Sequence, residues 1–359
     1  MEFILNDRLI KTDKPGGMTL LDFVRYEKHL MGTKIGCREG DCGACTILIG
    51  ELSQGEVRYL SMTSCIAPLA NAEGKHIVTV EGLNLPALSP VQNAFVEAGG
   101  TQCGFCTVGF VVSLTGYCIT ATDPTFEDAI SAIDGNICRC TGYKSIERAA
   151  ENVVGQLRSI VPKKKLEWLV NNHFIPEYFL TIPARLSAIS KSTTASSGPN
   201  HRAGFGIVGG GTDLYVQRPE DFTAVEVNPF FGRQDISGIS STTKTCTVGA
   251  ASTVTDLLHS PVFNKLFPEL RKHLKLISST QIRNMGTIGG NLVNASPIGD
   301  MTIFFLALDS SLTLRMTTGE SRNVLLRDFY KKYKTIDKGD DEFVEAISFE
   351  TIGKGAHFN

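Results

Sequence analysis

The stretch Gly36-Cys-Arg-Glu-Gly-Asp-Cys-Gly-Ala-Cys45 gathers three cysteines into one short segment, and Cys65 follows twenty residues later. This spacing, C-x4-C-x2-C with a distant fourth cysteine, is typical of the 2Fe-2S loop of plant-type ferredoxins. Such a loop must bend around a small inorganic core, and its three glycines permit this because glycine adopts positive φ. A zinc ion fits the pattern less well, since zinc sites usually combine two short cysteine pairs. The stretch therefore predicts an iron-sulfur cluster held by Cys37, Cys42, Cys45 and Cys65.

A second set of cysteines comes as two short pairs. Cys103 and Cys106 lie in Gln-Cys-Gly-Phe-Cys, and Cys138 and Cys140 lie in Asn-Ile-Cys-Arg-Cys-Thr-Gly-Tyr. Four thiolates in two pairs suit either two bridged irons or one tetrahedral zinc, and the spacing alone leaves both open. The two remaining cysteines, Cys118 and Cys246, we expect to be buried as small apolar side chains.

Composition restricts the classes of protein that this chain can represent. Its 359 residues suffice for two or three domains, each with a core of its own. Lys plus Arg number 35 against 37 Asp plus Glu, a balance that argues against nucleic acid or an anionic membrane as the main partner. The first residues do not resemble a secretory signal, and the longest apolar run, near Ile303–Leu308, is too short to span a bilayer. We expect a soluble cytoplasmic protein whose cysteines bind metal in a reducing compartment.

The N-terminal pattern is that of a small sheet with one helix. Residues 3–10 predict a hairpin around Asn6-Asp7, and Thr19 predicts a helix N-cap. The apolar face of that helix is expected to contain Leu20, Phe23, Val24 and Met31. Strands are predicted at 46–49, 57–60 and 77–80. The sequence thus predicts a ferredoxin-like domain over residues 1–82.

From about residue 90 the apolar period becomes helical. Helices are predicted at 91–98, 107–117 and 125–133, and a wide apolar face from Ile146 to Ile160 predicts a fourth. Each cysteine pair precedes a helix, whose free N–H groups would stabilise thiolates. We therefore expect a compact four-helix domain over residues 83–161 that depends on its metal.

The remainder is predicted to be a linker followed by a mixed α/β domain. The run Pro162-Lys-Lys-Lys165 starts the linker, which extends over residues 162–183, and a Ser/Thr-rich loop is expected at 190–199. The domain itself is assigned to residues 184–359. Strands are expected at 247–250 and 312–316.

Two glycine-rich stretches mark this last domain. The first, Gly204–Asp213, contains a literal GxGxxG, but no apolar strand precedes it, so it is not a Rossmann fingerprint. A strand over 205–208 that enters the turn Gly209–Asp213 is the better interpretation, because successive N–H groups there can bind a pyrophosphate. The second stretch, Gln281–Asn291, leads to Asn294–Asp300. Together the two suit a dinucleotide, whereas each alone is equally consistent with an ordinary tight turn.

The order of these motifs resembles the small, iron-sulfur and flavin subunit of bacterial xanthine dehydrogenases, in the molybdenum hydroxylase family. The motifs are C-x4-C-x2-C...C, CGFC...CRCTGY, VGGGTD and QIRNMGTIGGN...ASPIGD, and they span nearly the whole chain. The resemblance implies a multidomain α+β fold: a β-grasp ferredoxin-like 2Fe-2S domain, a four-helix 2Fe-2S domain and a vanillyl-alcohol-oxidase-type α/β FAD-binding domain. In the family this last domain continues well beyond a segment like Phe343–Phe349, so with the chain ending at Asn359 we expect it to be shortened at its C-terminus.

The resemblance also implies cofactors, partners and site residues. The first cysteine set would hold an outer cluster near the flavin, and the second an inner cluster beside the molybdopterin of a separate large subunit, where Gln102 and Cys140 approach the pterin. The FAD contacts would be Gly206, Ile207, Val208, Gly209, Gly210, Gly211, Thr212, Asp213, Ile277, Thr287, Ile288, Gly289, Gly290, Asn291, Asp300 and Val344.

Electron transfer is the activity that the resemblance implies. Electrons from oxidation of xanthine or hypoxanthine on the large subunit would pass through both clusters to FAD and then to NAD, within a hetero-oligomer and without a catalytic residue in this chain. Two alternatives remain: a related molybdenum hydroxylase acting on an aldehyde, nicotinate or carbon monoxide, or a zinc-stabilised interaction module that has lost its flavin part.

Overall fold

The computed structural model describes residues 1–160, 162–193 and 206–351 and divides into two compact units. The first unit consists of Met1–Gly198 with the segments Arg218–Val225 and Ser279–Ile282. The second consists of Pro199–Gln217, Glu226–Ser278 and Arg283–Asn359. Two segments from the second half of the chain thus pack with the N-terminal unit.

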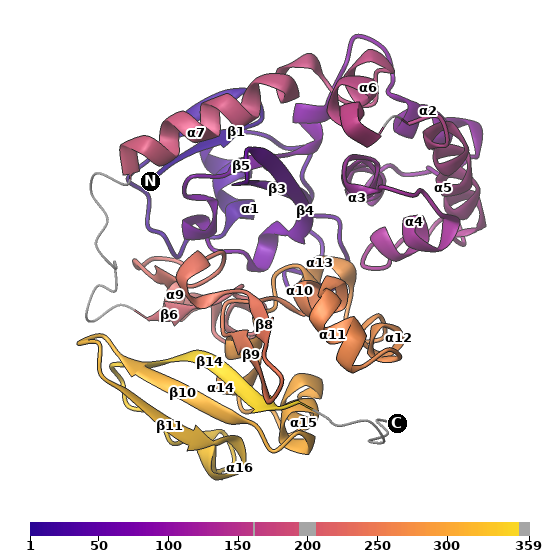
Figure 1. The fold of residues 1–359 in the computed structure, drawn as a ribbon. Coiled ribbons are helices and arrows are strands. Elements are labelled where there is room, and N and C mark those ends of the chain that lie inside the picture. The colour runs from indigo at the N-terminus through magenta and orange to yellow at the C-terminus, as the bar shows by residue number, and fades with distance from the viewer. Residues whose placement is uncertain (161, 194–205, 352–359) are drawn as a thin grey trace. The chain divides into compact units, whose positions relative to one another are not determined.

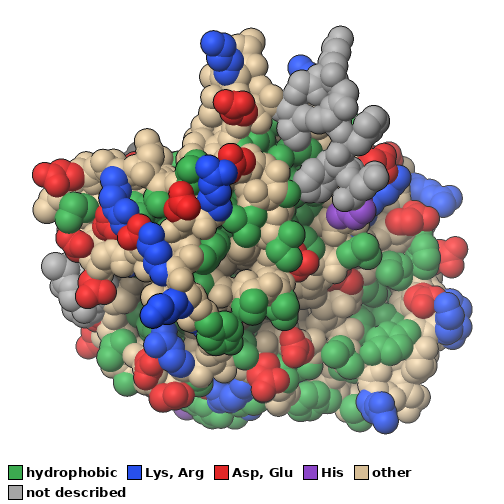
Figure 2. All heavy atoms as spheres, turned by 90° about the horizontal axis from the view of Figure 1, so that it is seen from below, with side chains coloured by type: hydrophobic (Ala, Val, Ile, Leu, Met, Phe, Trp, Pro, Cys, Tyr) green, Lys and Arg blue, Asp and Glu red, His purple; other side chains and the backbone are tan. Residues whose placement is uncertain are grey.

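The surface carries both signs of charge. On the face shown in Figure 2, Lys and Arg side chains lie among Asp and Glu side chains. This mixture agrees with the near-equal numbers of basic and acidic residues. In the described ranges no helix has the length and apolar character needed to cross a membrane.

The first unit is built around a five-stranded sheet with the strand order β2-β1-β5-β3-β4. Strands β1 and β5 are parallel and the other pairs are antiparallel, so the predicted ferredoxin-like fold is confirmed. The predicted hairpin turns at Asn6-Asp7, and the β3–β4 hairpin turns at Gln54 (φ 51°) and Gly55 (φ 86°), as a type I′ turn requires. The strands are β1 (Glu2–Leu5), β2 (Arg8–Lys11), β3 (Thr46–Ser53), β4 (Glu56–Thr63) and β5 (His76–Val78).

The helix expected after Thr19 is shorter than predicted. Thr19 does cap it, since its hydroxyl accepts a hydrogen bond from the Asp22 N–H at 3.1 Å. The α-helix α1 (Leu20–Asp22) then passes into one π-helical turn, η1 (Phe23–Glu27). The chain turns away at His29 (φ 56°), and Met31 is 49% exposed. The prediction that Met31 shares the buried helix face is therefore wrong.

Four helices follow the sheet, as predicted. They are α2 (Pro90–Glu97), α3 (Thr107–Thr120), α4 (Phe126–Ala132) and α5 (Lys144–Leu157). Helix α3 is buried nearly all round because it contacts β3 and β4 as well as α2 and α4. It can lie close to β3 because Gly116 has no side chain: a Cβ there would lie 2.7 Å from Leu48. The apolar stripe of α5 faces the core as expected, from Ile146 to Leu157.

The segment predicted as a linker, residues 162–183, is largely helical. It contains η5 (Pro162–Lys164), α6 (Lys165–Asn171) and η6 (Glu177–Thr181), and α7 (Ile182–Thr193) follows. Leu169, Phe174 and Phe179 are buried in the core of the first unit, which explains why the segment packs despite its lysine run. Helix α7 lies along β1 (Figure 1), where Ile182 and Leu186 contact Ile4. The loop expected at 190–199 is helical to residue 193, and the rest lies outside the described residues.

The second unit is built around an antiparallel sheet with the order β11-β10-β14-β9-β8. The strands expected at 247–250 and 312–316 are confirmed as β9 and β10. Short helices pack against the sheet around Leu257, Phe263 and Phe305. Cys246 in this core and Cys118 in the first unit are both buried, as predicted. The elements that build the unit are β8 (Ile239–Ser241), β9 (Thr245–Gly249), α10 (Val254–His259), α11 (Pro261–Leu266), α12 (Leu270–Leu274), α14 (Ile288–Val293), α15 (Asp300–Ala307), β10 (Ser311–Met316), β11 (Ser321–Leu325), α16 (Leu326–Phe329) and β14 (Glu342–Glu350).

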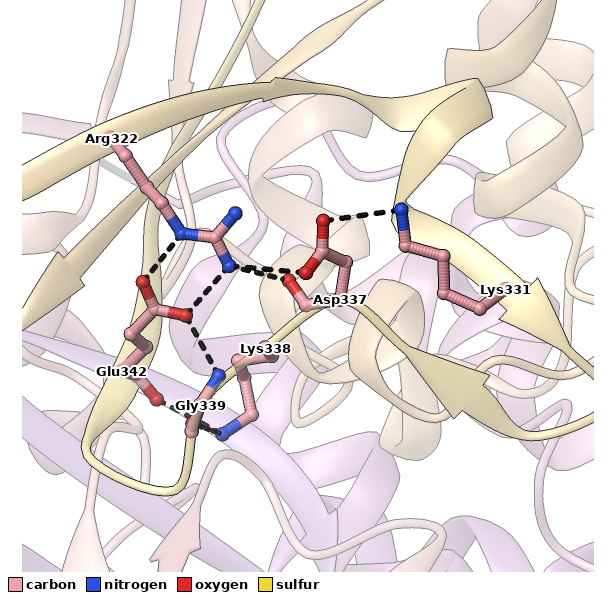
Figure 3. Close-up of polar contacts among 6 residues, drawn as sticks. All are labelled: Arg322, Lys331, Asp337, Lys338, Gly339 and Glu342. Atoms are coloured by element: carbon pink, nitrogen blue, oxygen red, sulfur yellow. Dashed lines mark hydrogen bonds and ion pairs between the residues drawn. The ribbon is translucent and has the colours of Figure 1, made fainter.

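An ion-pair network fixes the start of β14 (Figure 3). Glu342, 6% exposed, accepts hydrogen bonds from Arg322 Nε at 2.7 Å and Nη2 at 2.9 Å, and from the Gly339 N–H at 2.7 Å. Asp337 connects Arg322 to Lys331. The forked Arg322 pair lowers the pKa of Glu342 to about 2. The network therefore joins β11, the loop before β14 and β14 itself.

This geometry predicts an acid-sensitive second unit. The folded-state pKa of Glu342 lies below the unfolded value. The stability that the ionised carboxylate contributes is therefore present above about pH 4.5 and is lost as pH falls toward 2. We expect Glu342→Gln to lower the free energy of unfolding by about 1–2 kcal/mol at pH 7, allowing for the solvent exposure of Arg322. Urea unfolding of both proteins between pH 7 and 3 measures this difference. Glu269→Gln, which removes an exposed pair with Lys272, is the control and should leave stability unchanged; an equal effect of both variants would contradict the account.

Candidate iron-sulfur and flavin sites

The four cysteines of the first set meet between the loop that precedes β3 and η2 (Ser64–Ile66). Their thiols contact one another in a chain: Cys42 with Cys37, Cys37 with Cys65, and Cys65 with Cys45. Glycines shape the loop as predicted. Gly40 and Gly43 have φ of 82° and 67°, and a Cβ on Gly36 would lie 2.5 Å from the Cys42 sulfur.

The surroundings of this set favour the thiolate at Cys37 and Cys45 only, because hydrogen bonding to those two thiols raises the pKa of Cys65 and burial raises the pKa of Cys42. The hydrogen bond from Cys65 lowers the pKa of Cys37 to about 4, and the Glu39 N–H also donates to the Cys37 sulfur at 3.3 Å. A hydrogen bond from Cys65 likewise lowers the pKa of Cys45. Cys45 and Cys65 are only 2% and 4% exposed, so a cation is needed to hold four such sulfurs as thiolates. The site therefore fits a cationic metal core.

The four cysteines of the second set also come together, at the N-terminal ends of two helices. The sulfurs of Cys103 and Cys140 are 3.8 Å apart, and the thiol of Cys106 contacts that of Cys138. Cys106 is the N-cap residue of α3, and the Thr141 hydroxyl donates to the Cys138 sulfur at 3.2 Å. Cys103 and Cys140 are exposed, whereas Cys138 is buried. The Gln102 side chain donates to the Cys140 carbonyl at 3.1 Å.

The thiols of the second set are arranged as two pairs. The second set contributes two separate thiol pairs, which matches two bridged irons with two thiolates each. A tetrahedral zinc would need all four sulfurs around one point.

The two glycine-rich stretches of the second unit come together. Strand β6 (Ile207–Val208) enters the turn Gly209–Asp213, and Thr287 caps α14. A Cβ on Gly209 would lie 2.5 Å from the Thr287 hydroxyl, and a Cβ on Gly210 would lie 1.9 Å from the Met285 carbonyl oxygen. The loops can approach only because both residues are glycines.

Polar groups at this junction fit a dinucleotide. Gly211 has φ of 88°, the left-handed conformation used by anion-binding turns. Asp213 accepts hydrogen bonds from Asn294 at 2.9 Å and from Gln217 at 2.8 Å. The side-chain oxygen of Asn291 is buried without a hydrogen-bond partner, which a bound donor would satisfy. The residues present therefore fit FAD.

The other predicted flavin positions are less closely tied to these loops. Ile277 is half-buried against the core of the second unit, Val344 is buried within it, and Asp300 is exposed at the start of α15. Gly206 is the first described residue of its stretch; Gly204 and Phe205, which the prediction included, lie outside the described residues.

Sequence reasoning missed Arg283, which is 2% exposed. Its guanidinium donates to the carbonyls of Lys275, Ile277 and Ser278 at 3.2, 2.9 and 2.6 Å. The arginine thereby fixes the loop that carries Ile277. Its position inside an apolar and glycine-rich motif was the only signal in the sequence.

Removal of this arginine should release the loop. We expect Arg283→Met to lower the free energy of unfolding by about 2–4 kcal/mol, because three partly buried carbonyls lose a charged donor. Chemical unfolding measures the loss, and hydrogen exchange should show faster exchange in the segment around residues 275–278. Lys275→Met, which keeps the backbone carbonyl, is the control; a variant Arg283→Met of wild-type stability would contradict this role.

Family models match three consecutive parts of the chain. Residues 3–70 match a 2Fe-2S iron-sulfur cluster binding domain, and residues 79–151 match a [2Fe-2S] binding domain. Residues 180–349 match the FAD binding domain in molybdopterin dehydrogenase. The chain thus carries two 2Fe-2S domains and an FAD-binding domain of the type found in molybdopterin dehydrogenases. The fold expected for all three domains is thereby confirmed.

Curated relatives of these domains are much longer proteins. A xanthine dehydrogenase of Blastobotrys adeninivorans is 48% identical over 151 residues, covering 40% of this chain and 10% of the relative. Xanthine dehydrogenase 1 of Arabidopsis thaliana is 26% identical and covers 95% of this chain and 30% of the relative. Aldehyde oxidase 2 of Macaca fascicularis is 27% identical, with coverages of 96% and 30%. The chain thus spans three tenths or less of these relatives.

Among solved structures, quinoline 2-oxidoreductase from Pseudomonas putida 86 matches 44% of this chain and 94% of that chain. The sequence identity is 35% and the TM-score is 0.37. The superposition is too weak to add to the assignment of the domains.

Proposed function

We propose that this chain is the electron-transfer component of a xanthine dehydrogenase, comparable to the small subunit of the bacterial enzymes. It would relay electrons from a molybdopterin-binding large subunit to NAD during the oxidation of xanthine or hypoxanthine, in the cytoplasm. The observation that carries this proposal is the presence, in one chain, of two convergent four-cysteine sets followed by two paired glycine loops. The domain boundaries proposed are 1–82, 83–161 and 184–359, with 162–183 between them.

The proposed cluster ligands are the two cysteine sets. Cys37, Cys42, Cys45 and Cys65 would hold the outer cluster, and Cys103, Cys106, Cys138 and Cys140 the inner one. When bound, such clusters exchange single electrons and the flavin exchanges a hydride with NAD. The chain itself holds these groups: buried cysteines exclude water on the outer side, and exposed Cys103 and Cys140 leave the inner set open toward a partner.

The proposed FAD site comprises residues 206–213 and 287–291, with Ile277, Asp300 and Val344 at its edges. Its support is the contact between the two glycine turns and the unpartnered oxygen of Asn291. No side chain of this site is asked to form or break a bond with a purine, because the substrate would bind to the large subunit. We therefore assign no catalytic residue to the chain.

A second candidate is the equivalent component of a related molybdenum hydroxylase that acts on an aldehyde. The 27% identity to aldehyde oxidase 2 over 96% of the chain is nearly the same as that to the plant xanthine dehydrogenase. The cluster and flavin residues do not distinguish the two, because both classes of enzyme use the same relay. Only the partner and its substrate separate them.

The deciding experiment captures the tagged chain from its native host together with its partners and records anaerobic absorption spectra before and after xanthine is added. We expect the visible absorption of the clusters and of the flavin to bleach with xanthine. Bleaching by an aldehyde but not by xanthine would assign the chain to the second candidate. A brown complex that neither substrate bleaches would contradict both candidates.

A further inference from the structure

One peptide group in the outer cysteine loop, between Gly43 and Ala44, is held from both sides. Its carbonyl oxygen, on Gly43, accepts hydrogen bonds from the Thr46 N–H at 3.0 Å, the Thr46 hydroxyl at 2.6 Å and the Asn136 amide at 3.0 Å. The N–H of the same peptide, on Ala44, donates to the Cys42 sulfur. In a planar trans peptide the N–H and C=O point in opposite directions. The donors on the oxygen therefore also fix the direction of the N–H toward sulfur.

Asn136 reaches this peptide from the turn between α4 and α5. Its side chain is 4% exposed and has all its hydrogen-bonding positions occupied. The amide nitrogen donates to Gly43 and to the Thr46 hydroxyl at 3.2 Å, and the oxygen accepts from Ser113 at 2.8 Å and Gln281 at 3.0 Å. A flipped amide would set its oxygen against the Gly43 carbonyl. The network thus admits one orientation of Asn136.

Three glycines leave the peptide no room to move away. A Cβ on Gly43 would lie 2.3 Å from the Gly135 carbonyl oxygen, and a Cβ on Gly109 of α3 would lie 2.2 Å from the Gly43 carbonyl oxygen. A Cβ on Gly135 would lie 2.0 Å from the Gln281 side-chain oxygen. The helical part of the first unit is therefore in direct contact with the outer cysteine loop. Interiors packed this closely hold groups in one position.

From these contacts we propose that Asn136 is a positioning residue for the outer cluster: through the Gly43–Ala44 peptide it sets the N–H donor on Cys42 and so raises the reduction potential of that cluster. The inference rests on the proposed function, in which Cys42 is a ligand. Reduction adds negative charge to the cluster and its sulfurs, so an N–H donor stabilises the reduced form, and hydrogen bonds to sulfur are among the determinants of cluster potentials. Asn136 lies two positions before Cys138, so the turn that holds the outer loop also carries an inner-cluster ligand.

The test is an anaerobic redox titration of the intact complex, followed by electron paramagnetic resonance, which reports each cluster separately. At the potential where the wild-type outer cluster is half reduced, we expect Asn136→Ala and Thr46→Val each to lower its ratio of reduced to oxidised form about threefold. Thr46→Ser keeps the hydroxyl donor and should retain the wild-type ratio. In Thr46→Val the inner cluster should keep its potential, because Thr46 does not contact its ligands.

The outcomes separate this inference from the function on which it rests. An outer signal that is absent already in the wild type overturns both the 2Fe-2S assignment and the inference. Two signals in the wild type, with an unchanged outer potential in Thr46→Val, overturn only the proposal that the hydrogen bonds on the Gly43 carbonyl set the potential. If Asn136→Ala does not fold, the comparison of Thr46→Val with Thr46→Ser still decides. An equal shift of the outer-cluster potential in Thr46→Val and Thr46→Ser would likewise contradict this proposal.

Discussion

Cys138→Ala is expected to lose half of the iron and half of the acid-labile sulfide of the wild-type chain. Cys138 is buried at the start of the turn to α5, and its thiol contacts Cys106 at the end of the first pair. With three ligands the inner cluster should not be retained. The helices whose N-terminal ends carry its cysteines then lose the metal centre that joins them. Iron and sulfide analysis and the visible spectrum measure the loss.

Cys118→Ala supplies the matched control. Cys118 is also a buried cysteine of the helical part, but it belongs to neither set. Its replacement should cost about 1–2 kcal/mol of stability through a small cavity and leave iron and sulfide unchanged. Equal iron content in Cys138→Ala and wild type would contradict the assignment of the second set.

Gly210→Ala is expected to weaken FAD binding at least about fivefold. The added Cβ would lie 1.9 Å from the backbone oxygen of Met285, so one glycine loop must move away from the other. Overpacking of this kind costs about 1–3 kcal/mol, which corresponds to roughly five- to 150-fold in the dissociation constant if the cost falls on the bound conformation. Fluorescence titration of FAD into the deflavinated protein measures the change.

Gly155→Ala makes the same chemical change at a position where nothing lies within 4 Å of the new Cβ. Gly155 is inside α5, so alanine there should stabilise the helix by about 0.5–1 kcal/mol and leave FAD affinity unchanged. Wild-type FAD affinity in Gly210→Ala would show that the two loops do not form the flavin site together.

Much of the fold could be predicted because local signals agree with the tertiary structure. Period-two strands, the Thr19 cap and the apolar stripe of α5 all lie where the sequence placed them. The exceptions arise from long-range packing. The helix after Thr19 ends early at a π-turn, and the lysine-rich segment 162–183 is helical because Leu169, Phe174 and Phe179 find a core far away in the sequence.

That each cysteine set comes together could be predicted, because the spacing of cluster ligands follows from the size of the metal core. The choice between two irons and one zinc could not, since it depends on which thiols contact each other in space. Asn136, Gln281 and Arg283 were missed for the same reason: a buried amide or guanidinium acts on carbonyls that are distant in sequence or hidden in a loop. A single sequence gives no signal for such partners.

The proposed electron relay requires that this chain hold two different 2Fe-2S clusters. The most direct measurement is electron paramagnetic resonance of the anaerobically purified chain after reduction, combined with iron, sulfide and zinc analysis of the same sample. We expect two distinct signals, iron and sulfide in equal amounts, and loss of one signal in Cys138→Ala. Zinc without sulfide, or one signal that survives removal of either cysteine set, would contradict the proposed relay.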